Sequence, residues 1–280
     1  MGKSVFTDMI FSVFILYALL SFIVAYIYPK YKGIGFLGFY CFAALATLTK
    51  EPLGLIIPLM SSVVFLAYVR QMRFLLSPWM LVGLMAYSLV AAPWYWYEFS
   101  TYGQNFIREF FYNDHWRRLI EAEHKSNDRW FFYPLTMLAG LFPWGLFLIA
   151  VGVDLYKRLK YGLKFFEYFL FAWVVVVLFI FQIAHSKLAS YILPMFPALA
   201  LLVANYIDGR IEDLRTVNVK KISYVTSSFL ILIGVAVLAA YRYYEVYIPS
   251  SMPAYFLSAG LISIGGVGLV LLLKDKIRAG

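Results

Sequence analysis

The feature that most constrains this chain is a series of long apolar stretches separated by short polar connections. Each stretch is about 17–22 residues long, close to the roughly 20 residues that an α-helix needs to cross a bilayer core. The sequence predicts helices near residues 9–28, 34–50, 52–69, 76–96, 131–152, 165–184, 188–207, 222–241 and 253–273. The runs are continuously apolar, which argues against a membrane β-barrel with its alternating strands. We therefore expect an all-α integral membrane protein, a polytopic bundle of about nine transmembrane helices.

The composition agrees with a membrane location. Hydrophobic residues make up 63% of the chain and charged residues 14%, whereas about a quarter of an ordinary soluble domain is charged. The net charge of +9 could suggest nucleic-acid binding. Most of the surplus lies beside apolar stretches, so membrane topology is the better explanation, and we expect no nucleic-acid partner. The single cysteine, Cys41, lies in an apolar stretch and cannot form an internal disulfide.

The basic residues alternate between successive connections. The connections 29–33, 70–75, 153–164 and 208–221, together with the C-terminal tail, carry 15 of the 24 Lys and Arg residues. Because Lys and Arg concentrate on the cytoplasmic side of membrane segments, these connections are predicted to lie inside. We expect residues 1–280 to form one transmembrane domain of the plasma membrane, with its N-terminus and its chemistry on the extracytoplasmic side.

The longest connection, 97–130, is predicted to be an extracytoplasmic loop with an amphipathic helix. Phe106, Phe110 and Trp116 can form an apolar stripe, and such a helix can lie in the headgroup layer. A plain interfacial helix with solvated charges is the alternative. His124 follows two acidic residues and could bind a divalent metal or a phosphate. It could equally be a solvated side chain, since no ligand spacing typical of zinc sites surrounds it.

Two lysines stand next to apolar sequence at predicted helix ends, Lys50 and Lys187. A charge at bilayer depth costs about 2.5–3.5 kcal/mol, so such residues tend to face a cavity or a partner. The alternative is that they extend to the interface. Two lysines beside apolar walls suit a ligand with an apolar tail and an anionic head, such as a lipid phosphate. Asp8 begins a helix on the same face and could be a base, a metal ligand or a helix N-cap.

Five short motifs, in order, resemble those of the polyprenyl-phosphate-sugar-dependent membrane glycosyltransferases of the GT-C fold. This group includes the dolichyl-phosphate-mannose–protein mannosyltransferases and the lipid A aminoarabinose transferases. The motifs are Leu48-Thr49-Lys50-Glu51-Pro52-Leu53-Gly54, Pro93-Trp94-Tyr95, Glu123-His124-Lys125 through Trp130-Phe131-Phe132-Tyr133-Pro134, Gly140-Leu141-Phe142-Pro143-Trp144, and Ser186-Lys187-Leu188-Ala189-Ser190-Tyr191-Ile192-Leu193-Pro194.

The resemblance implies transfer of a sugar from a polyprenyl-phosphate carrier to a protein or lipid acceptor on the extracytoplasmic side. It implies that Lys50 and Lys187 help to hold the lipid phosphate, with Tyr191 beside it, and that His124 lies near that phosphate or a divalent metal. Arg117 or Arg118 resembles an arginine of the family's loop, and both are candidates to bind the lipid phosphate. Asp8 resembles an acid that begins a helix in the family, and it is our candidate for a catalytic role near the acceptor.

The chain also departs from the family pattern. Glu51 replaces a glycine, and Ala189-Ser190 replaces Pro-Thr. The resemblance begins after the family's N-terminal portion, and it implies that the acid expected to act as base lies in that portion. We therefore expect the chain to be inactive without that portion, which a separately encoded partner could supply. The alternative is a catalytically inactive paralogue that binds polyprenyl-phosphate lipid or acts as a scaffold. A transporter is disfavoured, because inverted repeats and midplane charges are not evident.

Overall fold

A computed structural model describes residues 7–50, 52–107, 128–142, 144–209, 217–244 and 252–278. Within these ranges the chain forms helices and no β-strand, as the apolar stretches predict. The α-helices are α1 (Thr7–Ile27), α2 (Lys32–Lys50), α3 (Leu53–Tyr68), α4 (Pro78–Tyr102), α5 (Gln104–Ile107), α7 (Phe132–Gly140), α8 (Gly145–Leu159), α9 (Phe165–Ile183), α10 (Phe196–Asp208), α11 (Val217–Tyr244) and α12 (Met252–Arg278). Short 3-10 helices occur at η1 (Pro29–Tyr31), η2 (Met72–Leu76) and η4 (Ala189–Met195).

Each of the nine predicted stretches contains a helix, but fewer of them have the length and hydropathy of a full membrane crossing. Within the described ranges, five helical segments meet both requirements, and a sixth is added if α7 and α8 form one broken span. α3 has 16 residues, so it is only about 24 Å long, shorter than a bilayer core of about 30 Å. The structure thus shows a multi-pass helical membrane protein without establishing nine crossings.

Several boundaries differ from the prediction, and two of the differences involve prolines. The predicted helix near 131–152 is divided into α7 and α8, and the sequence between them contains Pro143, which lies outside the described residues. Proline lacks the amide hydrogen that a helix interior requires, which gives a physical reason for the break. In contrast, α4 continues through Pro93 to Tyr102, where Gly103 with φ of 57° ends it. Within the predicted 97–130 loop, the first six residues therefore belong to α4, and 108–127 lie outside the described residues.

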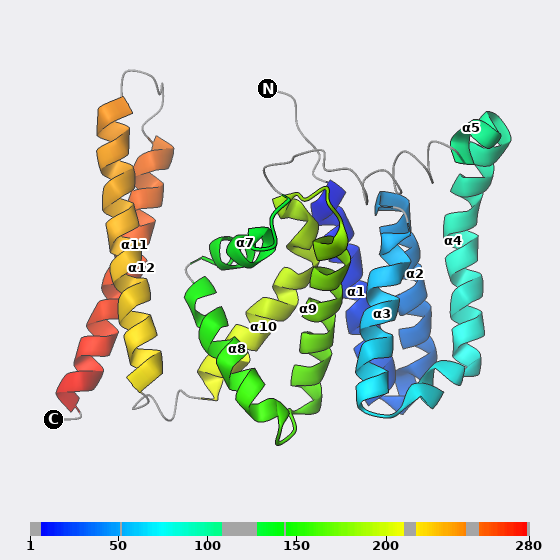
Figure 1. Ribbon diagram of the computed structural model, residues 1–280, viewed down its shortest axis with the longest axis horizontal. Coiled ribbons are helices and arrows are strands. Elements are labelled where there is room, and N and C mark those ends of the chain that lie inside the picture. Colours follow the sequence, from blue (N-terminus) through cyan, green and yellow to red (C-terminus); the bar gives the residue numbers. More distant parts are fainter. Residues whose placement is uncertain are drawn as a thin grey trace. The chain divides into compact units, whose positions relative to one another are not determined.

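The chain divides into two compact units. Unit 1 comprises residues 1–137 and 157–202, and unit 2 comprises 138–156 and 203–280. In unit 2, α11 and α12 form a hairpin whose glycines allow close packing (Figure 1). A Cβ atom added at Gly265 would lie 2.6 Å from the backbone oxygen of Ser227, and one at Gly268 would lie 2.5 Å from its hydroxyl. Small residues at this interface let the two helices approach closely, as is common in membranes.

An aromatic core holds unit 1 together. α1 lies against α2 and α3, and α3 lies against α9 (Figure 1). Phe22 of α1 is 3% exposed, and its ring centroid lies 6.1 Å from those of Phe65 and Phe169 and 5.8 Å from that of Phe74. Aromatic pairs at these separations add stabilisation to the area that they bury. The cluster therefore fixes α1, α3, η2 and α9 with respect to one another.

Successive helices of unit 1 run in opposite directions. The polar residues at their ends therefore gather at two opposite ends of the unit. At one end α1 begins and α2 ends; we call it the Lys50 end. At the other end α1 finishes and η2 follows α3; we call it the Arg70 end. The hydroxyl of Tyr26 in α1 donates a hydrogen bond of 3.0 Å to Gln71 at the Arg70 end. The start of α9 belongs there too, because the ring of Phe165 stacks on Tyr26 with centroids 5.6 Å apart.

Candidate functional site

The Lys50 end contains an ion pair between two of the predicted site residues. Asp8 lies in the first turn of α1, and Lys50 is the last residue of α2. Because α1 and α2 form an antiparallel hairpin, these two positions meet, and the Lys50 ammonium group donates to the Asp8 carboxylate. The side chains are 21% and 15% exposed. A charge pair so far from full hydration interacts more strongly than an exposed surface pair.

Aromatic rings surround the same ammonium group. Lys50 Nζ lies 4.0 Å from the ring centroid of Tyr191, 5.7 Å from that of Phe11 and 5.8 Å from that of Phe181. Phe181 and Tyr191 also contact each other, with centroids 5.4 Å apart. The faces of aromatic rings attract cations, so these rings hold Lys50 in place and replace part of its hydration.

The second predicted lysine, Lys187, belongs to a neighbouring polar cluster. Its Nζ atom donates a 2.6 Å hydrogen bond to Oδ1 of Asp128, and its side chain is only 5% exposed. Nδ1 of His185 lies 2.7 Å from Oδ2 of the same carboxylate. The hydrogen bonds with His185 and Lys187 hold the pKa of Asp128 below its usual value. Asp128 therefore stays ionised at neutral pH and joins two basic side chains.

Tyr191 connects the two clusters along the chain. The segment after α9 carries His185 and Lys187, and it continues into η4, which contains Tyr191. η4 lies against both α1 and α9, which places the Tyr191 ring next to Lys50. Four of the predicted site residues therefore lie at the Lys50 end: Asp8, Lys50, Lys187 and Tyr191.

The other predicted site residues, Arg117, Arg118 and His124, lie outside the described residues. The predicted divalent metal at His124 therefore stays a prediction. Within the ranges that the structure describes, no group of three or more His, Cys, Asp or Glu side chains could hold a metal ion.

Sequence reasoning missed two residues of this site, Asp128 and His185. Asp128 is one of several acids near His124, and no periodicity in that loop distinguishes it from the others. His185 stands two positions before Lys187, and this spacing was a usable signal. Two basic side chains so close in sequence after a helix end could have been expected to share an acidic partner, although the chain bends at 185 and 186 and is not extended there.

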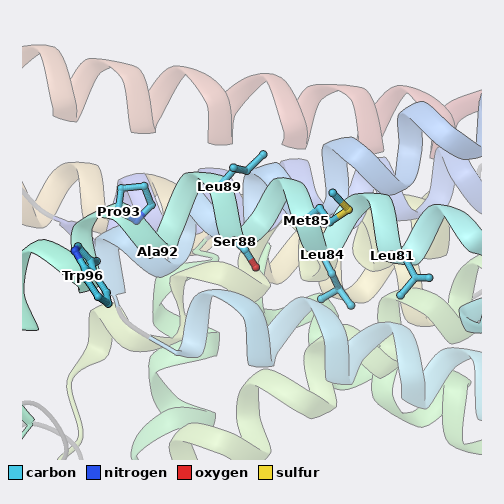
Figure 2. Close-up of a pocket in the computed structure, with 8 residues that line it drawn as sticks. All are labelled: Leu81, Leu84, Met85, Ser88, Leu89, Ala92, Pro93 and Trp96. Atoms are coloured by element: carbon cyan, nitrogen blue, oxygen red, sulfur yellow. The ribbon is translucent and has the colours of Figure 1, made fainter.

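An apolar groove of about 880 Å³ runs along α4 in unit 1 (Figure 2). Apart from Ser88, its lining is apolar: Leu81, Leu84, Met85, Leu89, Ala92, Pro93 and Trp96. Several of these side chains are largely exposed, including Leu89 at 76% and Trp96 at 74%. Such a surface suits contact with lipid chains. Among the described residues that line the groove, none carries a charge that could bind a phosphate.

Comparison with known proteins places these observations in context. No family model matches the chain. It is 31% identical over 241 residues to an undecaprenyl phosphate-alpha-4-amino-4-deoxy-L-arabinose arabinosyl transferase of Proteus mirabilis, which covers 84% of this chain and 41% of the relative. A transferase of the same name from Edwardsiella ictaluri is 30% identical, covering 64% of this chain and 31% of the relative. The chain thus spans less than half the length of these relatives.

Two solved structures share its fold. They are ArnT from Cupriavidus metallidurans bound to undecaprenyl phosphate, with a TM-score of 0.67, and the same protein in the apo state, with a TM-score of 0.63. Both are 19% identical, and each match covers 98% of this chain and 49% of ArnT. Together, the relatives and the structures confirm the resemblance to the polyprenyl-phosphate-sugar-dependent membrane glycosyltransferases over the stretch that the chain spans.

Proposed function

We propose that this chain holds the lipid phosphate of a polyprenyl-phosphate sugar donor in a membrane glycosyltransferase. The reaction would transfer the sugar to a lipid or protein hydroxyl. The Lys50 end would face the extracytoplasmic side of a bacterial inner membrane, as would the 97–130 loop. The observation that carries the proposal is that Lys50 and the Lys187–Tyr191 segment meet at one end of unit 1, in a fold shared with a protein solved with undecaprenyl phosphate.

The chemistry of the proposed reaction explains why lysines are needed. When the sugar leaves its carrier, the departing phosphate gains negative charge. Fixed positive groups stabilise that charge more in the transition state than in the ground state, which accelerates the reaction. Lys187 is 4% exposed and Lys50 is held among aromatic rings. Because these ammonium groups contact little water, they lose little hydration free energy when they contact an anion, and they therefore suit this role.

Asp8 is the acid that we propose for a role near the acceptor. A base needs a carboxylate oxygen that is free to accept a proton, and the Asp8 carboxylate accepts a hydrogen bond from the Lys50 ammonium group. In the proposed complex, the donor phosphate competes for Lys50, whose present partner is Asp8. Release of Asp8 by the arriving phosphate would couple donor binding to the availability of the carboxylate.

A second candidate function is an inactive paralogue that binds polyprenyl-phosphate lipid without turnover. The observation that favours it is that Asp8, the acid proposed here near the acceptor, is already paired with Lys50. For the first function, the acid that the resemblance assigns as base would have to come from a further segment or from a separately encoded partner. A turnover assay tests the second function: under either function we expect residues 1–280 alone to bind the lipid and to transfer no sugar. Sugar transfer by this chain alone would exclude the inactive paralogue.

Lipid binding tests the proposal itself. We would measure the affinity for undecaprenyl phosphate of the purified parent chain and of the variants Lys187→Met and Lys50→Met, all in neutral detergent. Each variant loses one charge-assisted contact, so we expect Kd to rise about tenfold or more. Lys160→Met, at an exposed position between α8 and α9, is the matched control and should bind like the parent. Equal affinity in all four proteins would refute the proposal.

A further inference from the structure

The Arg70 end contains a turn with an unexpected residue. After α3, the amide of Arg70 donates to the carbonyl of Ala67 (3.2 Å) and that of Gln71 donates to Leu66 (2.9 Å), the two bonds of a Schellman motif. Arg70 has φ of 56°, and it is the one non-glycine residue with positive φ in the part of the chain that the structure describes. Glycine is the usual residue at this position, because a Cβ atom disfavours left-handed backbone. An arginine here points to a use for its side chain.

The turn is held rigidly by the core. Phe74 in η2 contacts three rings, with centroid separations of 5.8 Å to Phe22, 5.4 Å to Tyr26 and 5.3 Å to Phe36. Gln71 accepts the hydrogen bond from the Tyr26 hydroxyl. The backbone that carries the neighbouring arginines is therefore fixed on both sides, which lowers the entropy cost of binding a ligand there.

Two arginines line a hollow at this turn. It has a volume of about 620 Å³ and is lined by Arg70, Gln71, Met72, Arg73 and Phe74. Lys32, at the start of α2, places its Nζ atom 4.7 Å from the ring centroid of Phe74. The segments 28–33 and 69–77 contain no acidic residue.

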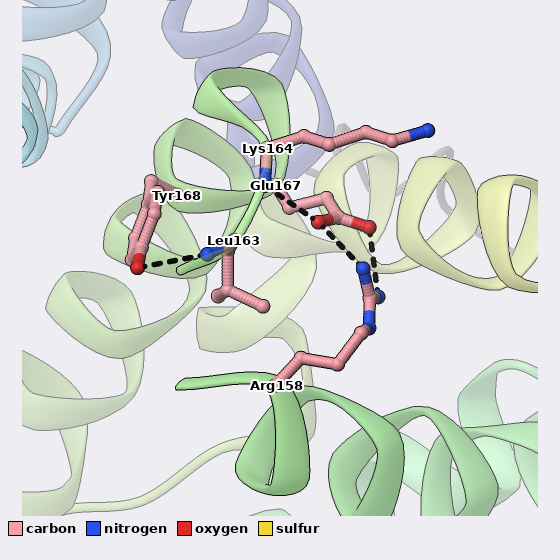
Figure 3. A network of polar contacts seen from close by, with 5 residues as sticks. All are labelled: Arg158, Leu163, Lys164, Glu167 and Tyr168. Carbon is pink, nitrogen blue, oxygen red and sulfur yellow. Dashed lines mark hydrogen bonds and ion pairs between the residues drawn. The ribbon is translucent and has the colours of Figure 1, made fainter. Parts of the chain in front are cut away.

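A third arginine at the same end shows the contrast. Arg158 binds both carboxylate oxygens of Glu167 at 3.0 and 2.8 Å, and Glu167 also accepts the Lys164 amide at 2.9 Å (Figure 3). Glu167 is 1% exposed, so the charge of Arg158 is balanced within the protein. Arg70 and Arg73 have no acidic partner in the described ranges. They remain available to an external anion.

We propose that Arg70 and Arg73, assisted by Lys32, bind the phosphate headgroup of an anionic membrane lipid. The proposal does not depend on the chemistry at the Lys50 end. Two exposed apolar residues follow the turn, Leu76 at 78% and Trp79 at 47%. Cations next to apolar surface suit a molecule with an anionic head and acyl chains, whereas a free anion would gain nothing from the apolar wall. Trp is also typical of the headgroup layer.

The test compares three ligands on the purified chain in neutral detergent: a short-chain phosphatidylglycerol, the corresponding phosphatidylcholine and inorganic phosphate. Affinity is measured by tryptophan fluorescence and by the shift in melting temperature. We expect phosphatidylglycerol to bind more tightly than either of the others. Equal binding of phosphatidylcholine would show apolar adsorption only, and equal binding of inorganic phosphate would show a simple anion site. Either result overturns the proposal.

Variants separate a specific site from a diffuse basic surface. Arg70→Gln and Arg73→Gln should each weaken phosphatidylglycerol binding about tenfold, because each removes a charge-assisted hydrogen bond. Lys160→Gln makes the same change of charge outside the hollow and should change Kd by less than about twofold. If Lys160→Gln weakens binding as much as Arg70→Gln, the basic end attracts lipids only through its overall charge, and the proposal fails.

Arg70→Gly keeps the test decisive if the glutamine variants fold poorly. Glycine suits the left-handed backbone at position 70, so this variant should melt at a higher temperature without lipid. It should also lose affinity for phosphatidylglycerol as Arg70→Gln does. A lower melting temperature without lipid, or unchanged lipid affinity, would show that the Arg70 side chain serves the fold rather than a ligand.

Discussion

Replacing Asp128 by Asn should destabilise the Lys50 end, because it removes the negative charge that Lys187 and His185 share. Lys187 is 5% exposed at its side chain, so its ammonium group gains little compensation from water when its carboxylate partner is removed. A hydrogen bond to a charged group contributes about 1.5–3 kcal/mol. Breaking a fully buried pair costs more, about 3–5 kcal/mol. Asp128 is itself 28% exposed, so the smaller range applies.

The assay is thermal unfolding of the purified chain in neutral detergent. For a chain of this size, about 1.5–3 kcal/mol corresponds to a fall in melting temperature of roughly 3–12 °C. Combining Asp128→Asn with Lys187→Met removes both charges and should recover part of the loss, since an apolar replacement of a charge pair is often nearly neutral. The account of this cluster is wrong if Asp128→Asn melts like the parent. It is also wrong if the double variant loses more stability than the two single variants lose in sum.

Further predictions concern the pKa of Asp128, the Arg158–Glu167 pair and two glycines. Because hydrogen bonds lower the pKa of Asp128 below 3.8, its stabilising effect is present above that value and is lost as the pH falls below it. The melting temperature should therefore fall more steeply from about pH 5 to about pH 3 in the parent than in Asp128→Asn. Glu167→Gln should cost about 1–3 kcal/mol in unfolding experiments, since it breaks a bidentate pair whose arginine is 36% exposed. Gly54→Ala should destabilise by about 1–3 kcal/mol, because a Cβ atom there would clash with the backbone of Ala46 and Thr47. A Cβ at Gly152 meets nothing within 4 Å, so Gly152→Ala should stabilise by up to about 1 kcal/mol.

Much of the fold could be predicted because a membrane helix is recognisable in the sequence as a long, continuous apolar stretch. The predicted 9–28 and 165–184 stretches correspond to α1 (Thr7–Ile27) and α9 (Phe165–Ile183). A bilayer favours a helical conformation for a long apolar stretch, independently of the helices that pack beside it. The division between α7 and α8 was harder to predict, because α4 tolerates Pro93 and continues. α4 contains Pro93 within the helix, whereas the sequence between α7 and α8 contains Pro143, and no local sequence pattern separates the two cases.

The site could be predicted in part. The alternation of basic and less basic connections predicts that Asp8, Lys50 and Lys187 lie at the same end of the helices. The described residues confirm this. The pairing of carboxylates with lysines could not be predicted. Asp8 meets Lys50 through the α1–α2 hairpin, whereas Asp128 reaches Lys187 from a loop without regular spacing. Such pairs between residues distant in sequence depend on how the helices pack, and no local sequence pattern predicts that packing.

The central claim is that the Lys50 end faces the extracytoplasmic space and the Arg70 end faces the cytoplasm. It can be measured by labelling single cysteines with a membrane-impermeant maleimide in spheroplasts, after Cys41→Ala removes the native thiol. Trp130 is 79% exposed and lies beside Arg129 and Asp128, and Tyr161 is 89% exposed between α8 and α9. We predict that Trp130→Cys reacts in intact spheroplasts, and that Tyr161→Cys reacts only after the membrane is permeabilised. Reaction of both positions from the same side, or of Tyr161→Cys alone from outside, would contradict the account.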